Sequence, residues 1–214
     1  LKVTNGNFFT TKTATDAAIL TAAQNSNIRV LSVSEGFKGF SDTMGAASDA
    51  GKFISIQSGN GFSAEPNAMA SAHFVLPGVV IVGGADGGGG LLPQSNRAGV
   101  TAERYVVSPG VTGFSPIFGT SFAAARIAGI GAAVLLQNPQ LTGEDVAQVI
   151  FASAEDRGEP GVDVEWGQGF VLDAAQVLNS IVGPPTIPTI DQASSGTGGS
   201  GGGGSSAAAG GLVL

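Results

Sequence analysis

Short apolar runs recur along the chain and alternate with longer stretches whose apolar residues have helical spacing. Four runs have the length and β-branched content of buried strands, at 28–33, 53–57, 79–82 and 105–107. The other stretches predict helices at 15–24, 42–50, 121–136, from 142 onward, and at 173–178. This alternation predicts an α/β fold, a three-layer sandwich with a mostly parallel sheet covered on both faces.

Each predicted strand ends in a loop of small and polar residues, at 34–36, 58–61, 83–90 and 108–110. The carboxyl ends of parallel strands lie at one edge of a sheet, where α/β proteins bind their ligands. The sequence therefore places a candidate site at this edge.

A turn of small residues precedes the Ala-rich helix and places the Ser121 hydroxyl in its first turn. Gly119 lets a second backbone pass close by, and the amides of a helix N-terminus favour negative charge beside a nucleophile. The alternative is that Thr120 or Ser121 only caps a core helix. Within the helix, Gly129 and Gly131 predict close packing on the sheet.

Composition narrows the class of protein. The 214 residues are 43% hydrophobic and 12% charged, which is typical of a folded domain. A net charge of −7 argues against binding to nucleic acid or to an anionic membrane. Cysteine is absent, and no apolar run reaches the ~20 residues of a membrane span. These properties are compatible with a bacterial protein that is secreted or at the cell surface.

The composition changes near the C-terminus. Residues 1–182 predict one domain, and residues 183–214 predict a flexible tail that is first Pro-rich and then almost wholly Gly, Ser and Ala. The sequence begins at Leu1 without a Met, and its first residues look like the end of a strand. We interpret it as a chain whose N-terminal part is missing.

Five motifs follow one another along the chain. They are 59–60, 82–85 with 95–96, 108–110, 119–123 with 127–129, and 166–169 with 173–175. In this order they resemble the subtilisin-like serine peptidases (subtilases) over residues 16–179, and the stretch 154–163 resembles the passenger domains of bacterial autotransporters. The resemblance implies a subtilisin-like fold and a serine endopeptidase that acts on polypeptides.

The resemblance also implies roles for individual residues. Ser121 would be the acylating nucleophile, and the Asn60 side-chain amide would donate a hydrogen bond to the oxyanion, with the Ser121 backbone amide as second donor. Two backbone edges would hold an extended peptide, and the substrate-binding set is Ser34, Glu35, Gly36, Ser58, Gly59 and Thr120. A carboxylate at position 35 would favour basic side chains in the peptide, unless it is a solvated loop residue.

A serine nucleophile needs a base and an orienting carboxylate. The Asp and His motifs of subtilases do not occur in these residues, and the single histidine, His73, lies where the family has no catalytic residue. Asp16 is interpreted as a helix-start residue. The sequence thus predicts part of a longer peptidase, inactive as the isolated chain. The alternative is an inactive protein that keeps the fold and the peptide groove.

Two further loops are candidate binding sites. The Gly-rich loop 87–90 lacks the Lys and Ser/Thr of a phosphate-binding loop. One loop carries five carboxylates without a recognisable calcium-ligand spacing: Glu155, Asp156, Glu159, Asp163 and Glu165. We therefore expect no cofactor and interpret the loop as solvated, with a structural calcium site as the alternative. Ala125 and Arg126 depart from the Pro and His of the family's nucleophile motif.

Overall fold

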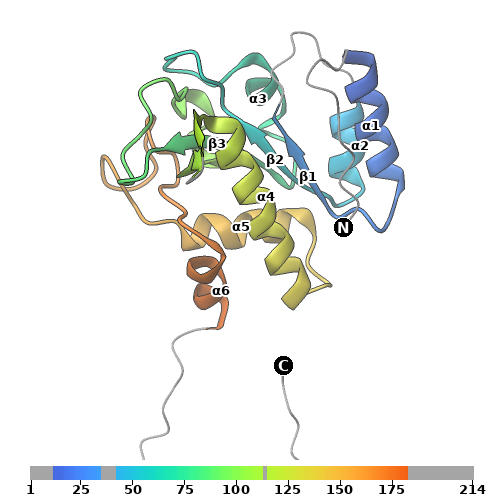
Figure 1. Ribbon diagram of the computed structural model, residues 1–214. Coiled ribbons are helices and arrows are strands. Elements are labelled where there is room, and N and C mark those ends of the chain that lie inside the picture. Colours follow the sequence, from blue (N-terminus) through green and yellow to red (C-terminus); the bar gives the residue numbers. More distant parts are fainter. Residues whose placement is uncertain (1–11, 35–41, 113–114, 183–214) are drawn as a thin grey trace, which may run out of the picture. The chain divides into compact units, whose positions relative to one another are not determined.

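The computed structural model describes residues 12–34, 42–112 and 115–182 (Figure 1). Its centre is a four-stranded sheet in the order β1-β2-β3-β4. All three strand pairs are parallel. The strands are β1 (Val30–Val33), β2 (Phe53–Gln57), β3 (Val79–Ala85) and β4 (Tyr105–Pro109). Each predicted strand is confirmed, and β3 and β4 continue into the predicted loops.

Helices cover both faces of the sheet, so the three-layer α/β sandwich is confirmed. On one face lie α1 (Lys12–Gln24), α2 (Thr43–Asp49) and α3 (Ala68–His73). On the other face lie α4 (Thr120–Gln137), α5 (Gly143–Ser153) and α6 (Ala174–Val182).

The side chains of β3 show how the two layers are built. Val79 and Ile81 point into one apolar cluster, and Val80 and Val82 point into the other. All of these side chains are fully buried, because successive residues of a strand face opposite sides of the sheet. This explains why the strand reads as a continuous apolar run.

Helix α4 packs directly on the sheet. A Cβ on Gly131 would lie 2.4 Å from the Phe53 ring, so only glycine permits this approach of helix and strand. The close-packing prediction is confirmed for Gly131 but wrong for Gly129, whose Cβ would meet nothing within 4 Å. Among the described residues, α4 is also the one helix long and apolar enough to cross a membrane, and 50% of it is buried within the fold.

Helix ends follow local hydrogen bonding where the sequence has strong caps. Thr142 and Asp145 form a capping box at the predicted start of α5. The Asp173 carboxylate accepts a hydrogen bond from the Gln176 amide at the start of α6, as expected. The helix predicted at 15–24 is confirmed, but its predicted start is wrong, because Thr15 and Asp16 lie inside α1.

Several elements were not predicted. Helix α3 lies in a stretch for which no element was predicted, and the 3-10 helix η1 (Gly99–Arg104) lies between β3 and β4. The short strands β5 (Val111–Thr112) and β6 (Ser115–Phe118) pair antiparallel and lead into α4. The predicted tail 183–214 lies outside the described residues.

Candidate functional site

The first turn of α4 carries Ser121. The N-cap residue is Gly119, and no side chain caps the helix. The interpretation of Thr120 or Ser121 as a cap is therefore wrong. Among the described residues, neither the Ser121 hydroxyl nor its backbone amide has a hydrogen-bond partner in this turn. Gly119 does allow a close backbone approach, because its amide donates to the Gly110 carbonyl at 2.8 Å.

Asn60 lies against this turn. Its Oδ1 accepts a hydrogen bond from the Thr120 backbone amide at 2.9 Å and lies 3.3 Å from the Thr120 hydroxyl. A Cβ on Gly119 would lie 3.1 Å from the same oxygen. The structure thus brings Asn60, Thr120 and the serine turn together, although they are 60 residues apart in sequence. Because Oδ1 faces the helix end, the Nδ2 amide is left to serve as a donor at an exposed position.

Ser58 and Gly59 lead from β2 into Asn60 and are both buried. Gly59 has φ +110°, a conformation that favours glycine, and an added Cβ would lie 2.6 Å from Asn96 Nδ2. Its amide donates to the Thr120 hydroxyl at 3.3 Å. The bend that aims Asn60 at α4 therefore depends on Gly59.

Asn96 holds the loop on its other side. Its Oδ1 accepts hydrogen bonds from the Gly61 amide at 2.8 Å and the Ser63 amide at 3.2 Å. Its Nδ2 donates to the Ser58 carbonyl at 3.1 Å. Asn96 belongs to one of the five motifs but was not among the predicted site residues. That motif is the sequence feature from which its role could have been inferred.

Tyr105 supports Asn96 from beneath. Its hydroxyl donates to the Asn96 carbonyl at 2.7 Å from a fully buried position at the start of β4. Burial raises the pKa of the Tyr105 phenol to about 12, so the group stays protonated and remains a donor. The loop that presents Asn60 is thus fixed to the sheet through buried polar groups.

Ser34 and Gln57 complete the edge of the sheet. The exposed Ser34 hydroxyl lies 3.4 Å from the Ser121 carbonyl. The Gln57 amide nitrogen donates to the Ser34 carbonyl at 2.7 Å, and its Oε1 accepts from the Thr120 hydroxyl at 3.0 Å. Gln57 was not among the predicted site residues. Glu35 and Gly36 lie outside the described residues.

His73 is the last residue of α3, in the layer across the sheet from α4. It is buried, and its Nδ1 lies 2.9 Å from the Met69 carbonyl of the same helix. The structure therefore places His73 on the opposite face of the sheet from α4 and Ser121.

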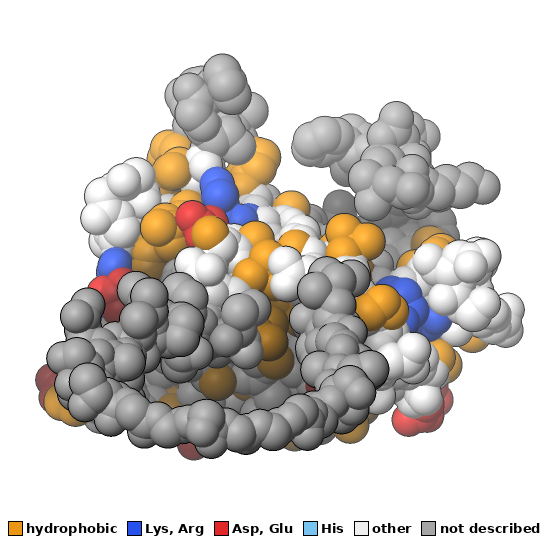
Figure 2. Space-filling view, turned by 90° about the horizontal axis from the view of Figure 1, so that it is seen from below, with side chains coloured by type: hydrophobic (Ala, Val, Ile, Leu, Met, Phe, Trp, Pro, Cys, Tyr) orange, Lys and Arg blue, Asp and Glu red, His pale blue; other side chains and the backbone are white. Residues whose placement is uncertain are grey.

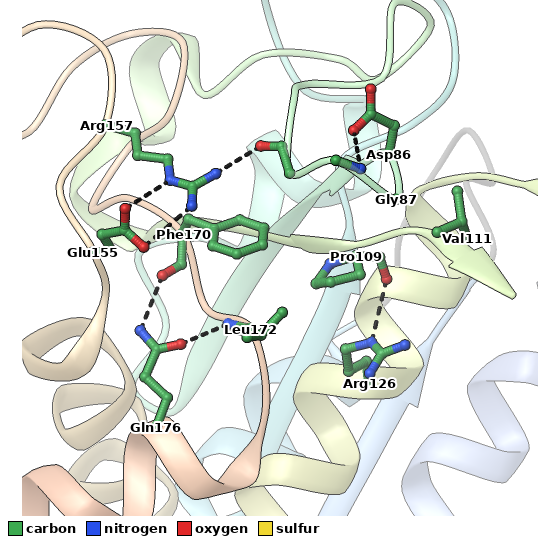
Figure 3. A pocket seen from close by; sticks show the side chains of 12 residues that line it. Asp86, Gly87, Pro109, Val111, Arg126, Glu155, Arg157, Phe170, Leu172 and Gln176 are labelled. Atoms are coloured by element: carbon green, nitrogen blue, oxygen red, sulfur yellow. Dashed lines mark hydrogen bonds and ion pairs between the residues drawn. The ribbon is translucent and has the colours of Figure 1, made fainter. Parts of the chain in front are cut away.

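The acidic loop is organised by its own arginine (Figure 3). Arg157 donates to both carboxylate oxygens of Glu155, at 3.2 and 3.1 Å, and its guanidinium lies 4.0 Å from the centre of the Phe170 ring. These groups line a pocket of about 720 Å³ that also includes Pro109 and Arg126. Among the described residues, no group of three or more His, Asp or Glu side chains could hold a metal ion.

Charged side chains are sparse on the surface. In the view from below (Figure 2), the Lys and Arg side chains of the described residues lie in small, separate groups. The absence of nucleic-acid binding stays a prediction.

The sheet, its two helical layers and the serine at the start of a core helix have the organisation of a subtilisin-like peptidase domain. The family model described as "Subtilase family" (Peptidase_S8) matches residues 1–169, and the chain belongs to this family.

Known proteins agree with this assignment. The chain is 30% identical over 158 residues to the Neisserial autotransporter lipoprotein NalP of Neisseria meningitidis serogroup B, strain MC58. The match covers 62% of this chain and 14% of NalP, so the chain spans a small part of that relative.

Two solved structures share the fold. The prenylagaramide maturation protease PagA has a TM-score of 0.65 at 18% identity, with 85% of this chain and 72% of that chain covered. The self-cleaved protease domain of PatA has a TM-score of 0.63 at 20% identity, with 80% and 68% covered.

Proposed function

We propose that this chain is part of a serine endopeptidase, to which it contributes Ser121 as nucleophile and Asn60 as oxyanion donor. One observation carries the proposal: Asn60 Oδ1 accepts the Thr120 amide at 2.9 Å. That bond fixes the side-chain amide beside the serine turn and leaves its N–H groups for a substrate. Membership of the subtilase family supports a polypeptide substrate.

The reaction follows from this arrangement. The Ser121 hydroxyl attacks the scissile carbonyl, and the negative charge that develops on the carbonyl oxygen meets the Asn60 side-chain amide and the Ser121 backbone amide. The N-terminus of α4 adds a favourable field at the same point. The amine of the cleaved bond leaves with the proton that a base has taken from Ser121. Water then releases the acyl group as a carboxylic acid and restores the Ser121 hydroxyl.

The hydroxyl proton of Ser121 must pass to a base. The single histidine of the 214 residues is His73, on the far side of the sheet. We therefore assign the base and its orienting carboxylate to a part of the protein outside these residues. The peptide would lie along the backbone edges at Ser34 and Ser58–Gly59 as an added strand.

A second candidate is a subtilase-fold protein that binds peptides without cleaving them. The position of His73 favours it, because a serine without a base is a poor nucleophile. The two functions differ in one respect that can be measured: only the peptidase turns over substrate.

We also propose that the protein is secreted or displayed at the bacterial cell surface. The support is the likeness to NalP, whose name describes an autotransporter lipoprotein.

Hydrolysis of a fluorogenic peptide library tests the proposed function. The protein encoded by the complete gene is compared with its Ser121→Ala variant and with Ser180→Ala, a control in α6 whose hydroxyl bonds only its own helix at Val177. The proposal expects turnover in the first and third proteins and its loss in Ser121→Ala. Turnover that survives Ser121→Ala contradicts it, and peptide binding without turnover supports the second candidate.

A further inference from the structure

Three side chains of β2 face α4, and each contacts the helix closer to its N-terminus than the one before. Phe53 lies under Gly131, and the buried Ser55 hydroxyl donates to the Ala124 carbonyl at 2.8 Å. Gln57 is the last step and reaches Thr120 at 3.0 Å. The strand therefore contacts the helix through an apolar ring, then a hydroxyl, and finally a buried amide next to Ser121.

The amide of Gln57 is bonded at both ends. Its Nε2 donates to the Ser34 carbonyl at 2.7 Å, and its Oε1 accepts from the Thr120 hydroxyl at 3.0 Å. The amide orientation is fixed by chemistry, because a carbonyl oxygen such as that of Ser34 can only accept. The Thr120 hydroxyl, which donates to Gln57, in turn accepts from the Gly59 amide at 3.3 Å.

One side chain thus joins three segments that the proposed reaction requires. These are the end of β1 at Ser34, the loop after β2 at Gly59, and the turn of α4 that carries Ser121. A buried amide costs free energy unless its polar atoms are bonded, so losing either partner leaves the other end unsatisfied. The network consequently favours a single relative position of the three segments.

We propose that Gln57 is a positioning residue that holds the first turn of α4 in register with the end of β1. It keeps the Ser121 hydroxyl and the Asn60 amide directed at the same substrate carbonyl. It touches neither substrate nor reacting atoms and acts through Thr120. This inference rests on the proposed function and adds to it a residue that sets the geometry of the site.

Replacement by a side chain of similar length without hydrogen bonds tests the role. In the complete protein, Gln57→Met is expected to lower kcat by about 10- to 100-fold, because small displacements of catalytic groups carry large rate penalties. KM is expected to change by less than about threefold, since the pairing of β1 with β2 keeps the peptide-binding edges in place without Gln57. Hydrogen exchange at residues 119–125 is expected to become faster.

Ser55→Ala is the matched control. It removes one buried hydrogen bond from the same face of the same strand to the same helix, but at Ala124 and away from Ser34 and Asn60. It is expected to lower Tm and to leave kcat within about twofold of wild type, as a purely structural contact would.

Thr120→Val is a second variant that tests the positioning role, and it does so even if Gln57→Met fails to fold. It removes the hydroxyl that Gln57 holds and keeps the side-chain shape. Both changes break the hydrogen bond between Gln57 and Thr120, and each also breaks a bond of its own. Because the Gln57–Thr120 bond can be lost only once, the double variant is expected to lose less kcat than the product of the two single losses. Independent, multiplicative losses would overturn the inference.

The outcomes separate this inference from the proposed function. If the wild-type protein cleaves peptides and Gln57→Met behaves like Ser55→Ala, the positioning role is wrong and the peptidase stands. If the wild-type protein neither cleaves peptides nor reacts at Ser121, both are overturned. A kcat loss confined to Gln57→Met and Thr120→Val supports both.

Discussion

The Oδ1 atom of Asn60 accepts the backbone amide of Thr120 at 2.9 Å, so a loop after one strand is joined to the start of a helix 60 residues later. The bond uses the one atom of the side-chain amide that cannot donate. It thereby leaves the Nδ2 end of Asn60, an exposed residue, available as a hydrogen-bond donor. The serine turn and the loop that carries Asn60 are therefore joined directly.

Asn60→Asp separates the role of this side chain as an acceptor for the Thr120 amide from its proposed role as a donor to the substrate. The aspartate keeps an oxygen for the Thr120 amide but presents a carboxylate where an N–H donor is needed. In the complete protein we expect kcat to fall by about 10²–10³-fold, the usual cost of losing an oxyanion donor. Steady-state kinetics with a thermal melt check this: Tm should move little, and an unchanged kcat would remove Asn60 from the mechanism.

Gly59→Ala tests the bend that presents Asn60. Alanine at φ +110° is strained, and its Cβ would press on Asn96 Nδ2 at 2.6 Å. We expect the free energy of unfolding to drop by about 2–4 kcal/mol. Urea denaturation measures this drop in the free energy of unfolding. Gly87→Ala is the control, because a Cβ at Gly87 meets nothing within 4 Å. Equal effects of the two substitutions would refute the strain argument.

Tyr105→Phe removes the support beneath Asn96. The lost hydrogen bond to the Asn96 carbonyl should cost about 1 kcal/mol of unfolding free energy. The folded state raises the pKa of this phenol from 10.0 to about 12, so its contribution is complete below pH 10 and is lost as pH rises toward 12. Alkaline melts of wild type should show this decline, and the same slope in Tyr105→Phe would contradict its assignment to Tyr105.

Stability at acid pH should depend on Glu144. The side-chain hydrogen bonds from Arg104, at 2.7 and 2.8 Å, lower the pKa of the Glu144 carboxyl from 4.5 to about 2. A lowered pKa stabilises the fold above pH 4.5, and this contribution disappears as pH falls toward 2. Glu144→Gln should flatten that part of the stability profile, whereas Glu159→Gln on the exposed loop should not. Parallel profiles for all three proteins would exclude the Glu144 explanation.

The fold was predictable where local pattern and burial coincide. Strand β2 was predicted residue for residue, because its short run rich in Phe and Ile ends at a loop of small and polar residues. The α5 capping box was equally visible, since its two partners lie three residues apart. Helix α3 was missed although Asn67 caps it by accepting from the Ala70 amide, because the helix is short and its residues are mostly small.

Less of the candidate site than of the fold could be predicted from the sequence. Ser121 and Asn60 could be proposed as site residues because short motifs surround them. The partners of Gln57 lie 23 and 63 residues away, so no local pattern indicates its role. Asn96 likewise acts on residues 33 to 38 positions earlier. Hydrogen bonds between distant loops depend on the tertiary structure, and these bonds define the geometry at Ser121.

The most direct test of the account is labelling with a fluorophosphonate serine probe, followed by mass spectrometry of the modified peptide. For the protein encoded by the complete gene, the account predicts one adduct per chain, on Ser121, and none in Ser121→Ala. For the isolated 214-residue chain it predicts no adduct, because its single histidine lies across the sheet from the serine. Full labelling of the Ser121→Ala variant, or stoichiometric labelling of the isolated chain, would contradict it.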